Sequence, residues 1–472
     1  MARARIEYLS PGEGDFIHEK ALEVLARTGV AYNSHKALDV LEAAGVEVDR
    51  DRLTAKLDAG VIEAALRTAP RQVLLAGRLP EHDHVLGGGR LVTTSDGMTT
   101  YVLDEPGGAR REGTAADLAA VTRLCDALGE IDVVWPSPQA GDVDAWSMPL
   151  VMQAVVARNT GKHVQDEVRT PELVEPVLAV YEAAAGVPLR ERPCFSVTIC
   201  TIAPLQHDRE MTEAGLELAA RGVPIFVLPM PQAGTTGPMT PLGTCIVYLA
   251  ELLSAVVLYQ LAAPGCPLAA GVGAAVADVR GGGYLSAAPE IGLINLVCLQ
   301  MSRRYGLPTQ ATGISPDARE SDFQAGSEGG MTGLVAALAG ADSLIAAGSL
   351  DGVQCSSLAK LVLDDDQLGA IRRYLRDDPI DEAAALLDDI LAVGIGGHYL
   401  GRRSTRHLAR TAIWQPRVFR RGSPAEGGAR SVVQAAAARA EELLATHTAP
   451  PLPPGAEERI DEVLAAWAAR RP

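Results

Sequence analysis

The residues Pro224-Ile-Phe-Val-Leu-Pro-Met230 form a short apolar run, and the polar loop Gly234-Thr-Thr-Gly-Pro-Met-Thr240 follows closely. The same order of apolar run, polar loop and helical pattern recurs at 267–273, 307–312 and 342–348. Short apolar strands that alternate with helices pair in parallel, and in such folds the site lies at the carboxyl ends of the strands. The stretch 224–373 therefore predicts an α/β fold with four polar loops on one face.

The region before this stretch continues the same alternation. Three further strands are expected at 131–135, 162–167 and 193–201, which makes seven in all. A closed TIM-type (β/α)8 barrel needs an eighth strand, and 352–357 and 413–417 are the candidates. An open doubly wound sheet is the alternative, but the length of each unit favours the barrel.

The chain divides into three predicted parts. Residues 1–112 form a smaller N-terminal α/β region, 113–425 the barrel, and 426–472 a C-terminal helical tail. The tail contains two amphipathic patterns, at 431–445 and 457–469, on either side of a proline-rich linker. We expect the last helix to pack on its own domain or on a neighbouring subunit of a homo-oligomer.

The composition excludes several classes of protein. The chain has 472 residues, 47% of them hydrophobic and 21% charged, which is typical of a globular protein with a large core. A net charge of −17 cannot neutralise a row of phosphates and argues against nucleic acid. The apolar window 246–263 carries Glu251 and Gln260, so we expect a buried barrel helix and no membrane span.

The cysteines and the amino terminus indicate a cytoplasmic protein. The seven cysteines are scattered and none forms a Cys-x-x-Cys pair, so a disulfide framework or zinc ribbon is not expected. The amino terminus shows no signal-peptide core. His82-Asp83-His84 lies in a turn-rich segment without a third ligand nearby, so no metal site is predicted. The glycine-rich segments complete neither Gly-x-Gly-x-x-Gly nor a phosphate-binding loop.

The loop after the first quoted strand offers three hydroxyls. Thr235, Thr236 and Thr240 precede a long helical pattern, and one threonine is enough to cap that helix. The surplus hydroxyls favour contact with a ligand.

The loop at 317–328 is rich in carboxylates, including Asp322 and Glu328. Glu328 lies near the start of a helix, where the helix dipole favours a negative charge and a cationic substrate could meet it. A solvated charge run explains the same residues equally well.

A series of motifs along nearly the whole chain is similar to the trimethylamine methyltransferase family of corrinoid-dependent methyltransferases. In chain order they are Ile17-His-Glu-Lys-Ala-Leu-Glu-Val-Leu-Ala-Arg-Thr-Gly29, 118–132, 234–240, Asp278-Val279-Arg280, Pro289-Glu290, Arg304-Tyr305-Gly306-Leu307-Pro308, 322–326, Leu350-Asp351, 361–365, Gly397-His398-Tyr399-Leu400 and Trp414. Each motif is weak alone, and their order is specific. Gly237 and Met239 depart from the family's loop.

The resemblance implies a barrel that moves a methyl group from an amine to the cobalt of a separate corrinoid protein. The chain lacks the Asp-x-His-x-x-Gly motif that ligates a corrinoid, so no tightly bound cofactor is predicted and the partner supplies the cobalamin. The founding members carry pyrrolysine and this chain does not. It therefore resembles the branch that includes enzymes acting on quaternary amines such as glycine betaine.

When a quaternary ammonium loses a methyl group, the leaving group is a neutral tertiary amine, so no general acid is needed. The protein then has to orient the substrate and exclude water. The expected catalytic carboxylates are Glu328, Asp322 and Asp278. Aromatic faces such as Trp135 or Tyr399 would contact the cation, and Arg280 or a helix amino terminus would bind a betaine carboxylate. The expected substrate-binding residues, chosen by loop position, are Thr235, Thr236, Thr240, Arg280, Gln324, Phe323, Tyr284, Asp351 and His398.

Two other functions remain open from the sequence alone. A barrel lyase or hydrolase acting on a small acid would be active without a cobalt protein. A non-catalytic betaine or amine binder would hold its ligand without turning it over.

Overall fold

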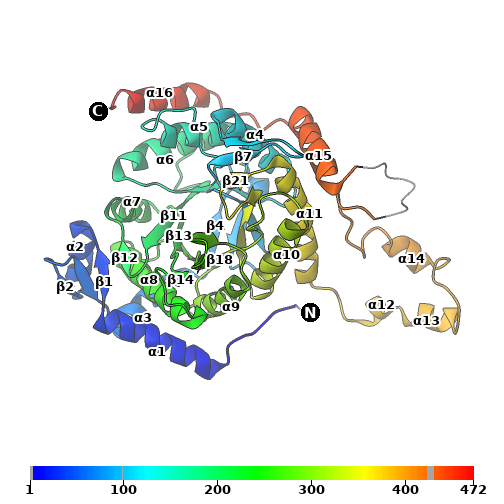
Figure 1. Ribbon diagram of the computed structural model, residues 1–472, viewed down its shortest axis with the longest axis horizontal. Coiled ribbons are helices and arrows are strands. Elements are labelled where there is room, and N and C mark those ends of the chain that lie inside the picture. The colour runs from blue at the N-terminus through cyan, green and yellow to red at the C-terminus, as the bar shows by residue number, and fades with distance from the viewer. Residues whose placement is uncertain (1–3, 98, 422–429, 472) are drawn as a thin grey trace.

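Eight parallel strands close into a barrel in the computed structural model, which describes residues 4–97, 99–421 and 430–471 (Figure 1). Pairing of β19 with β6 and of β6 with β9 closes the ring. The strands in chain order are β6 (Val92–Ser95), β9 (Val133–Val134), β10 (His163–Asp166), β11 (Phe195–Ile202), β13 (Ile225–Leu228), β15 (Leu268–Val272), β18 (Thr309–Thr312) and β19 (Ser343–Ala347). The predicted (β/α)8 barrel is confirmed.

Each barrel strand is followed by one main helix of the outer layer, as the alternating pattern predicts. In the same order the helices are α4 (Ala115–Ala127), α5 (Met148–Asn159), α6 (Pro171–Ala185), α7 (Arg209–Ala220), α8 (Pro241–Ala262), α9 (Pro289–Arg304), α10 (Phe323–Leu338) and α11 (Leu358–Leu375). By length and composition α8 could cross a membrane, but 78% of its apolar window is buried inside the protein. It is the buried barrel helix that the sequence predicts.

The expectation for the eighth strand was wrong. Neither 352–357 nor 413–417 enters the barrel; β21 (Cys355–Ser356) pairs instead with β7 (Tyr101–Leu103) in a small separate sheet. The missing strand is β6, which precedes the predicted boundary at residue 112. Its sequence, Val-Thr-Thr-Ser, has no apolar run because it lines a polar layer inside the barrel, where the hydroxyls of Thr94 and Ser343 lie 3.5 Å apart.

The centre of the barrel is hydrogen-bonded. Gln165 and Gln310 face each other across it and exchange two hydrogen bonds of 2.9 and 3.0 Å. Gln165 also donates to the hydroxyl of Thr198 at 2.9 Å. Paired amides satisfy the polar groups that this buried layer contains.

The N-terminal region covers the outside and one end of the barrel. It comprises α1 (Pro11–Arg27), β1 (Val30–Tyr32), α2 (His35–Ala43), β2 (Glu47–Asp49), β3 (Thr54–Lys56), α3 (Ala59–Thr68), β4 (Val73–Leu75) and β5 (His84–Leu86). The hairpin of β4 and β5 closes the amino end of the barrel, where Val73, Leu75 and Leu86 pack against Val133 and Phe226. The open end is therefore the carboxyl end.

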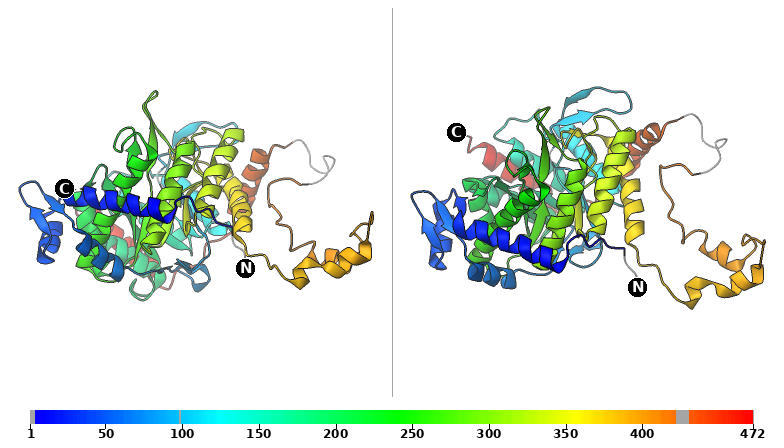
Figure 2. Two further views of the ribbon diagram at one scale, coloured as in Figure 1. Left: turned by 90° about the horizontal axis from the view of Figure 1, so that it is seen from below. Right: turned by 60° about the horizontal axis from the view of Figure 1, so that its bottom comes forward.

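Two small sheets stand at that open end. One contains β14 (Gln232–Ala233), β16 (Ala275–Asp278) and β17 (Gly283–Leu285); the other contains β20 (Ser349–Leu350), β21, β7 and β8 (Arg110–Glu112). The hairpins β16–β17 and β7–β8 project beyond the barrel on the same side (Figure 2). They form a rim around the mouth.

The C-terminal helices pack on the barrel of the same chain. α15 (Val432–Thr446) lies against α11 and α4, and α16 (Ala456–Ala468) lies against α6 and α5. Trp146 and Trp467 stack with centroids 4.7 Å apart, and each indole N–H donates to the other residue's carbonyl oxygen. These contacts confirm that the last helix packs on its own domain. The predicted boundary at 425 falls outside the described residues.

Candidate active site at the carboxyl end of the barrel

The mouth of the barrel carries a carboxylate. On β10 the residues His163, Gln165 and Glu167 alternate on one face, and the Gln165 side chain lies inside the barrel. Glu167 continues this alternation one layer higher, where its Oε1 lies 3.7 Å from the Sγ of Cys200 on β11. Glu167 thus brings a negative charge to the inner wall of the mouth.

The surroundings leave this carboxylate only partly neutralised. The Glu167 side chain is 11% exposed, and its Oε2 accepts from the Nε of Arg169 at 2.9 Å. The Arg169 side chain is 63% exposed, and solvent screening weakens a pair of this kind. Among the residues that the structure describes, the weak thiol donor of Cys200 is the one partner of the Oε1 atom, which faces the barrel.

An indole ring lies in the same layer. Trp135 is buried at the end of β9, where it packs with Leu228 and Ile345. Its N–H donates to the Oδ1 of Asp166 at 3.2 Å. A Cβ at position 97 would fall 1.9 Å from the Cδ1 of Trp135, so only glycine allows the loop after β6 to lie on the ring. The loop holds the indole in place.

The opposite wall is apolar. Leu228 and Met230 extend from β13 over two glycines of the neighbouring strand β15 and its loop. A Cβ on Gly271 would lie 2.7 Å from Leu228, and one on Gly273 would lie 2.8 Å from Met230. These glycines leave room for the two side chains. Packing of Leu228 and Met230 therefore explains the glycines at 271 and 273 without a nucleotide-binding site.

Cys200 is not poised as a nucleophile. Burial and the adjacent Glu167 carboxylate raise the pKa of its thiol well above the ordinary value. A thiol is a weak nucleophile compared with its thiolate. The arrangement therefore does not support covalent catalysis through this cysteine.

Asp166 differs from its neighbour Glu167. It is held by the amide of Gln153 on α5 and by the Trp135 N–H. Burial is the main cause that raises the pKa of the Asp166 carboxyl to about 7. Asp166 orients the indole from the helical layer and does not line the mouth.

Tyr284 of the β16–β17 hairpin stands above the barrel next to Gly352. A Cβ on Gly352 would lie 3.6 Å from the Cδ1 of Tyr284. Burial raises the pKa of its phenol, which stays protonated. The hairpin is tied down by Asp317, whose two oxygens accept the N–H groups of Ser286 at 2.7 Å and Ala287 at 3.2 Å.

The predicted catalytic residue Glu328 organises this loop. Its Oε2 accepts the backbone N–H groups of Asp317 at 2.8 Å and Ala318 at 3.2 Å, and its Oε1 accepts from Gln324 at 2.7 Å. Both oxygens are engaged within the loop. Glu328 thereby holds Asp317, and through it the hairpin that carries Tyr284.

The neighbouring predicted residues lie at the start of α10. Asp322 caps the helix by accepting the Ala325 N–H at 3.0 Å, and Gln324 is exposed and bonded to Glu328. Phe323 is 90% exposed. The structure does not bring these side chains into the layer of Trp135 and Glu167.

The threonine loop uses its hydroxyls locally. Thr236 accepts the Gln232 N–H at 2.9 Å, Thr240 caps α8 by accepting from Gly243 at 3.2 Å, and Thr235 is exposed. On the hairpin, Asp278 accepts the Arg280 N–H at 2.9 Å, which together with the Gly281 N–H lowers the pKa of that carboxyl. Arg280 is exposed at the rim.

Two predicted residues are far apart. Asp351 pairs with Arg110 and, at 3.3 Å, with Arg319, and its backbone N–H bonds to the carbonyl of Ala318 at the rim. His398 lies in an exposed segment that extends away from the barrel. Only Asp351 stands near the mouth.

Sequence reasoning considered Trp135 but missed Glu167. Glu167 ended a predicted strand, and the signal that could have found it is the alternation of polar residues at 163, 165 and 167. Polar residues on one strand face are usually read as solvent-exposed. Here that face is the barrel interior.

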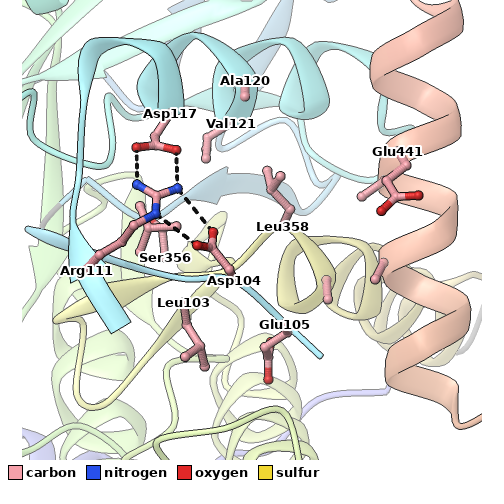
Figure 3. Close-up of a pocket in the computed structure, with 14 residues that line it drawn as sticks. Leu103, Asp104, Glu105, Arg111, Asp117, Ala120, Val121, Ser356, Leu358 and Glu441 are labelled. Carbon is pink, nitrogen blue, oxygen red and sulfur yellow. Dashed lines mark hydrogen bonds and ion pairs between the residues drawn. The ribbon is translucent and has the colours of Figure 1, made fainter. Parts of the chain in front are cut away.

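A separate cavity of about 270 Å³ lies on the flank of the barrel, between the β7–β8 hairpin, α4 and α15 (Figure 3). Its Arg111 is held by two carboxylates, with bonds of 2.9 and 3.1 Å to Asp104 and 2.7 and 2.8 Å to Asp117. With its charge compensated in this way, the cavity does not offer a cation to an anionic ligand. Among the residues that the structure describes, no group of three His, Cys, Asp or Glu side chains could hold a metal ion.

The family model for trimethylamine methyltransferase (MTTB) matches residues 2–472. Trimethylamine methyltransferase MttB of Desulfitobacterium hafniense (strain DSM 10664 / DCB-2) is 32% identical over 442 residues, covering 93% of this chain and 89% of that protein. Glycine betaine methyltransferase of Desulfitobacterium hafniense (strain Y51) is 28% identical over 465 residues, covering 96% and 95%.

The fold has a solved relative. Monomethylamine methyltransferase (MtmB) of Methanosarcina barkeri superposes with a TM-score of 0.54 at 10% identity, covering 98% of this chain and 88% of that one. At this identity the likeness concerns the fold alone.

Proposed function

The chain belongs to the trimethylamine methyltransferase family, and we propose that it transfers a methyl group from a quaternary amine, such as a betaine, to Co(I) of a separate corrinoid protein. It is a methyltransferase by family. The proposal concerns the charge of the substrate and the residues that recognise it.

The observation that carries the proposal is that Trp135 and Glu167 both lie next to Cys200 in one layer of the mouth. An indole face attracts a cation, by about 0.5 to 2 kcal/mol depending on desolvation. A carboxylate adds a direct charge interaction, and the apolar wall of Leu228 and Met230 suits methyl groups. A methylated ammonium combines the positive charge and apolar surface that this layer complements.

The chemistry places few demands on the protein. The C–N bond breaks, nitrogen keeps the electron pair and leaves as a neutral tertiary amine, so no proton has to be delivered. The corrinoid, when bound, supplies the Co(I) nucleophile that accepts the methyl group. The protein's own residues orient the ammonium and exclude water. A quaternary substrate is therefore consistent with a mouth that has no nucleophilic thiolate.

The rim supports two further assignments. Arg280, exposed on the hairpin at the mouth, is our candidate for a betaine carboxylate, and Tyr284 is a candidate contact for the methyl groups. Glu328 and Asp322 act as positioning residues for the loop below, and the threonines, Gln324 and Asp351 shape the rim. The projecting hairpins (Figure 2) surround the face to which a corrinoid protein would dock. A cytoplasmic location fits seven cysteines that are all free thiols.

The test is a spectroscopic assay. The protein is mixed with Co(I)cobalamin and, in turn, trimethylamine, glycine betaine, proline betaine, carnitine and choline. We expect the Co(I) absorption band to convert to that of methyl-Co(III) with a quaternary amine and not with trimethylamine. Turnover of trimethylamine alone, or no conversion across the panel even with the organism's own corrinoid protein, would overturn the proposal.

A further inference from the structure

A long segment leaves the body of the protein between α11 and α15. We define the arm as residues 376–416. It contains α12 (Glu382–Ala385), α13 (Leu387–Val393) and α14 (Arg403–Leu408). In Figures 1 and 2 the arm extends well away from the barrel and turns back at its far end. Its middle part, 382–408, stands away from the barrel (Figure 1), whereas its two ends meet α11.

The arm has local order of its own. Asp381 caps α12 by accepting the Ala384 N–H at 2.8 Å. Asp389 of α13 accepts from the Nε of Arg402 at 2.8 Å and from Ser404, both at the start of α14. These bonds fold the arm into a helical hairpin, so its shape does not require a partner to form the turn.

The base of the arm is fixed to the body. At its return, the backbone N–H groups of Arg417, Val418 and Phe419 all donate to the carboxylate of Asp366 on α11, at 2.7, 2.7 and 2.8 Å. The adjacent Asp365 pairs with the Arg417 side chain. The arm therefore projects from a rigid anchor.

The arm exposes an apolar surface that a solvated segment would not need. Ile380 is 82% exposed, Leu391 70% and Leu400 81%. Other exposed large apolar side chains of the arm are Leu386, Leu387, Ile390, Ile395, Tyr399 and Ile413. At about 60 to 120 Å² each, their burial would remove on the order of 800 Å² from water, the contribution of one partner to a standard interface.

The arm meets the body at an apolar cleft. This root cleft, of about 630 Å³, is lined by Tyr374 of α11 and by Ile380, Ile413 and Trp414 of the arm. The cleft and the arm thus form one continuous surface of the chain. A reciprocal exchange would let the arm of each copy fill the root cleft of the other.

The charges of the arm are complementary to themselves. Asp381, Glu382 and Asp388 lie exposed on the α12–α13 side. Arg403, Arg406 and Arg410 lie exposed on the α14 side, and none of the three forms an ion pair with a residue that the structure describes. In a two-fold contact the same surface is used twice, so the acidic side of one arm would face the basic side of the other.

From the apolar surface, the root cleft and this charge pattern, we propose that the arm docks on a second copy of the chain by reciprocal exchange. The occupant is a copy of this protein because the charges of the arm are complementary to themselves and because the root cleft offers an apolar site for its exposed apolar side chains. The proposal does not depend on the methyl-transfer reaction.

The first test measures oligomeric state by light scattering coupled to size exclusion, at micromolar concentrations. We expect the native protein to be a dimer or a multiple of one, and Leu391→Glu combined with Leu400→Glu to dissociate it. Leu74→Glu, an equally apolar-to-charged change on the exposed side of β4, is the matched control and should leave the oligomer intact. Circular dichroism and thermal unfolding check that each variant is folded.

The second test detects the exchange directly. Copies with Leu391→Cys and differently tagged copies with Ala370→Cys, which lines the root cleft, are mixed and treated with a short bis-maleimide. We expect a covalent product that carries both tags. A native protein that is monomeric at all concentrations overturns the proposal, as does an oligomer unchanged by the arm variants. A monomer that binds a corrinoid protein through the arm also overturns it and assigns the arm to that partner.

Discussion

Replacing Glu167 by glutamine tests the recognition of a cationic substrate most directly. A carboxylate about 4.5 Å from an ammonium contributes roughly 3 to 4 kcal/mol at an effective dielectric constant of about 20. Arg169, 2.9 Å from one Glu167 oxygen, offsets part of this attraction, and the amide of glutamine keeps a favourable dipole. We therefore expect Glu167→Gln to weaken binding by about 1.4 to 2.8 kcal/mol, or roughly 10- to 100-fold in Kd.

The assay is titration calorimetry with glycine betaine and with its carbon isostere, 3,3-dimethylbutanoate, in which an uncharged quaternary carbon replaces the ammonium nitrogen. The native protein should prefer the cation, and the variant should lose that preference while binding the isostere within about twofold of the native protein. Glu175→Gln is the control, because Glu175 also pairs with an arginine, Arg221, but lies on the exposed surface of α6, away from the mouth. The control should change neither affinity.

A Glu167→Gln variant that keeps its preference for betaine would refute the reasoning. An equal loss of affinity for both ligands would do the same, because it would indicate a change of shape and not of charge. Both interpretations require that the midpoint temperature of thermal unfolding of the variant lies within a few degrees of that of the native protein.

Three further predictions concern the support of the site and of the arm. Burial raises the pKa of Asp166 from 3.8 to about 7, so the contribution of the protonated carboxyl to stability is present below about pH 4 and is lost as the pH rises to about 7. Measured by denaturant unfolding between pH 5 and 8, the free energy of unfolding should fall less steeply with pH in Asp166→Asn than in the native protein. An unchanged slope would contradict this. Gly97→Ala should displace the Trp135 ring, cost about 1 to 3 kcal/mol and change the near-ultraviolet circular dichroism, whereas Gly12→Ala, where a Cβ meets nothing within 4 Å, should not. Asp366→Ala leaves three backbone N–H groups without their acceptor and should lower the free energy of unfolding by roughly 2 to 4 kcal/mol. Hydrogen exchange of the backbone amides at 417–419 should accelerate, and unaltered exchange there would show that the anchor of the arm lies elsewhere.

The barrel could be predicted because seven short strand patterns alternate with helical patterns along the chain. The eighth, β6, was not assigned to the barrel, because Thr94 faces the polar interior and Thr93 bonds to Asp132 on the other face, so the strand carries no apolar signal. The same inversion hid Glu167, since polar alternation on β10 suggests an exposed strand until the glutamine pair shows that this face is the core. Both errors come from a barrel whose centre is hydrogen-bonded instead of apolar.

The sequence did not indicate what the loop carboxylates bind, for a different reason. Glu328 and Asp322 occupy the expected loop, but backbone N–H groups of that loop bind one oxygen of each carboxylate. A carboxylate near a helix start satisfies either a ligand or its own backbone, and composition does not distinguish the two. The distances decide, and for these residues they favour positioning.

Asp166 and Glu167 show how the strand itself separates two roles. Successive side chains on a strand point to opposite faces, so one carboxylate meets Gln153 in the helical layer while the next meets Cys200 inside the barrel. Burial makes the first prone to hold a proton near neutral pH, where it accepts the indole N–H. The second stands at the mouth beside that indole. A shift of register by one residue would exchange the two, which ties the proposed cation recognition to the alignment of β10 with β11.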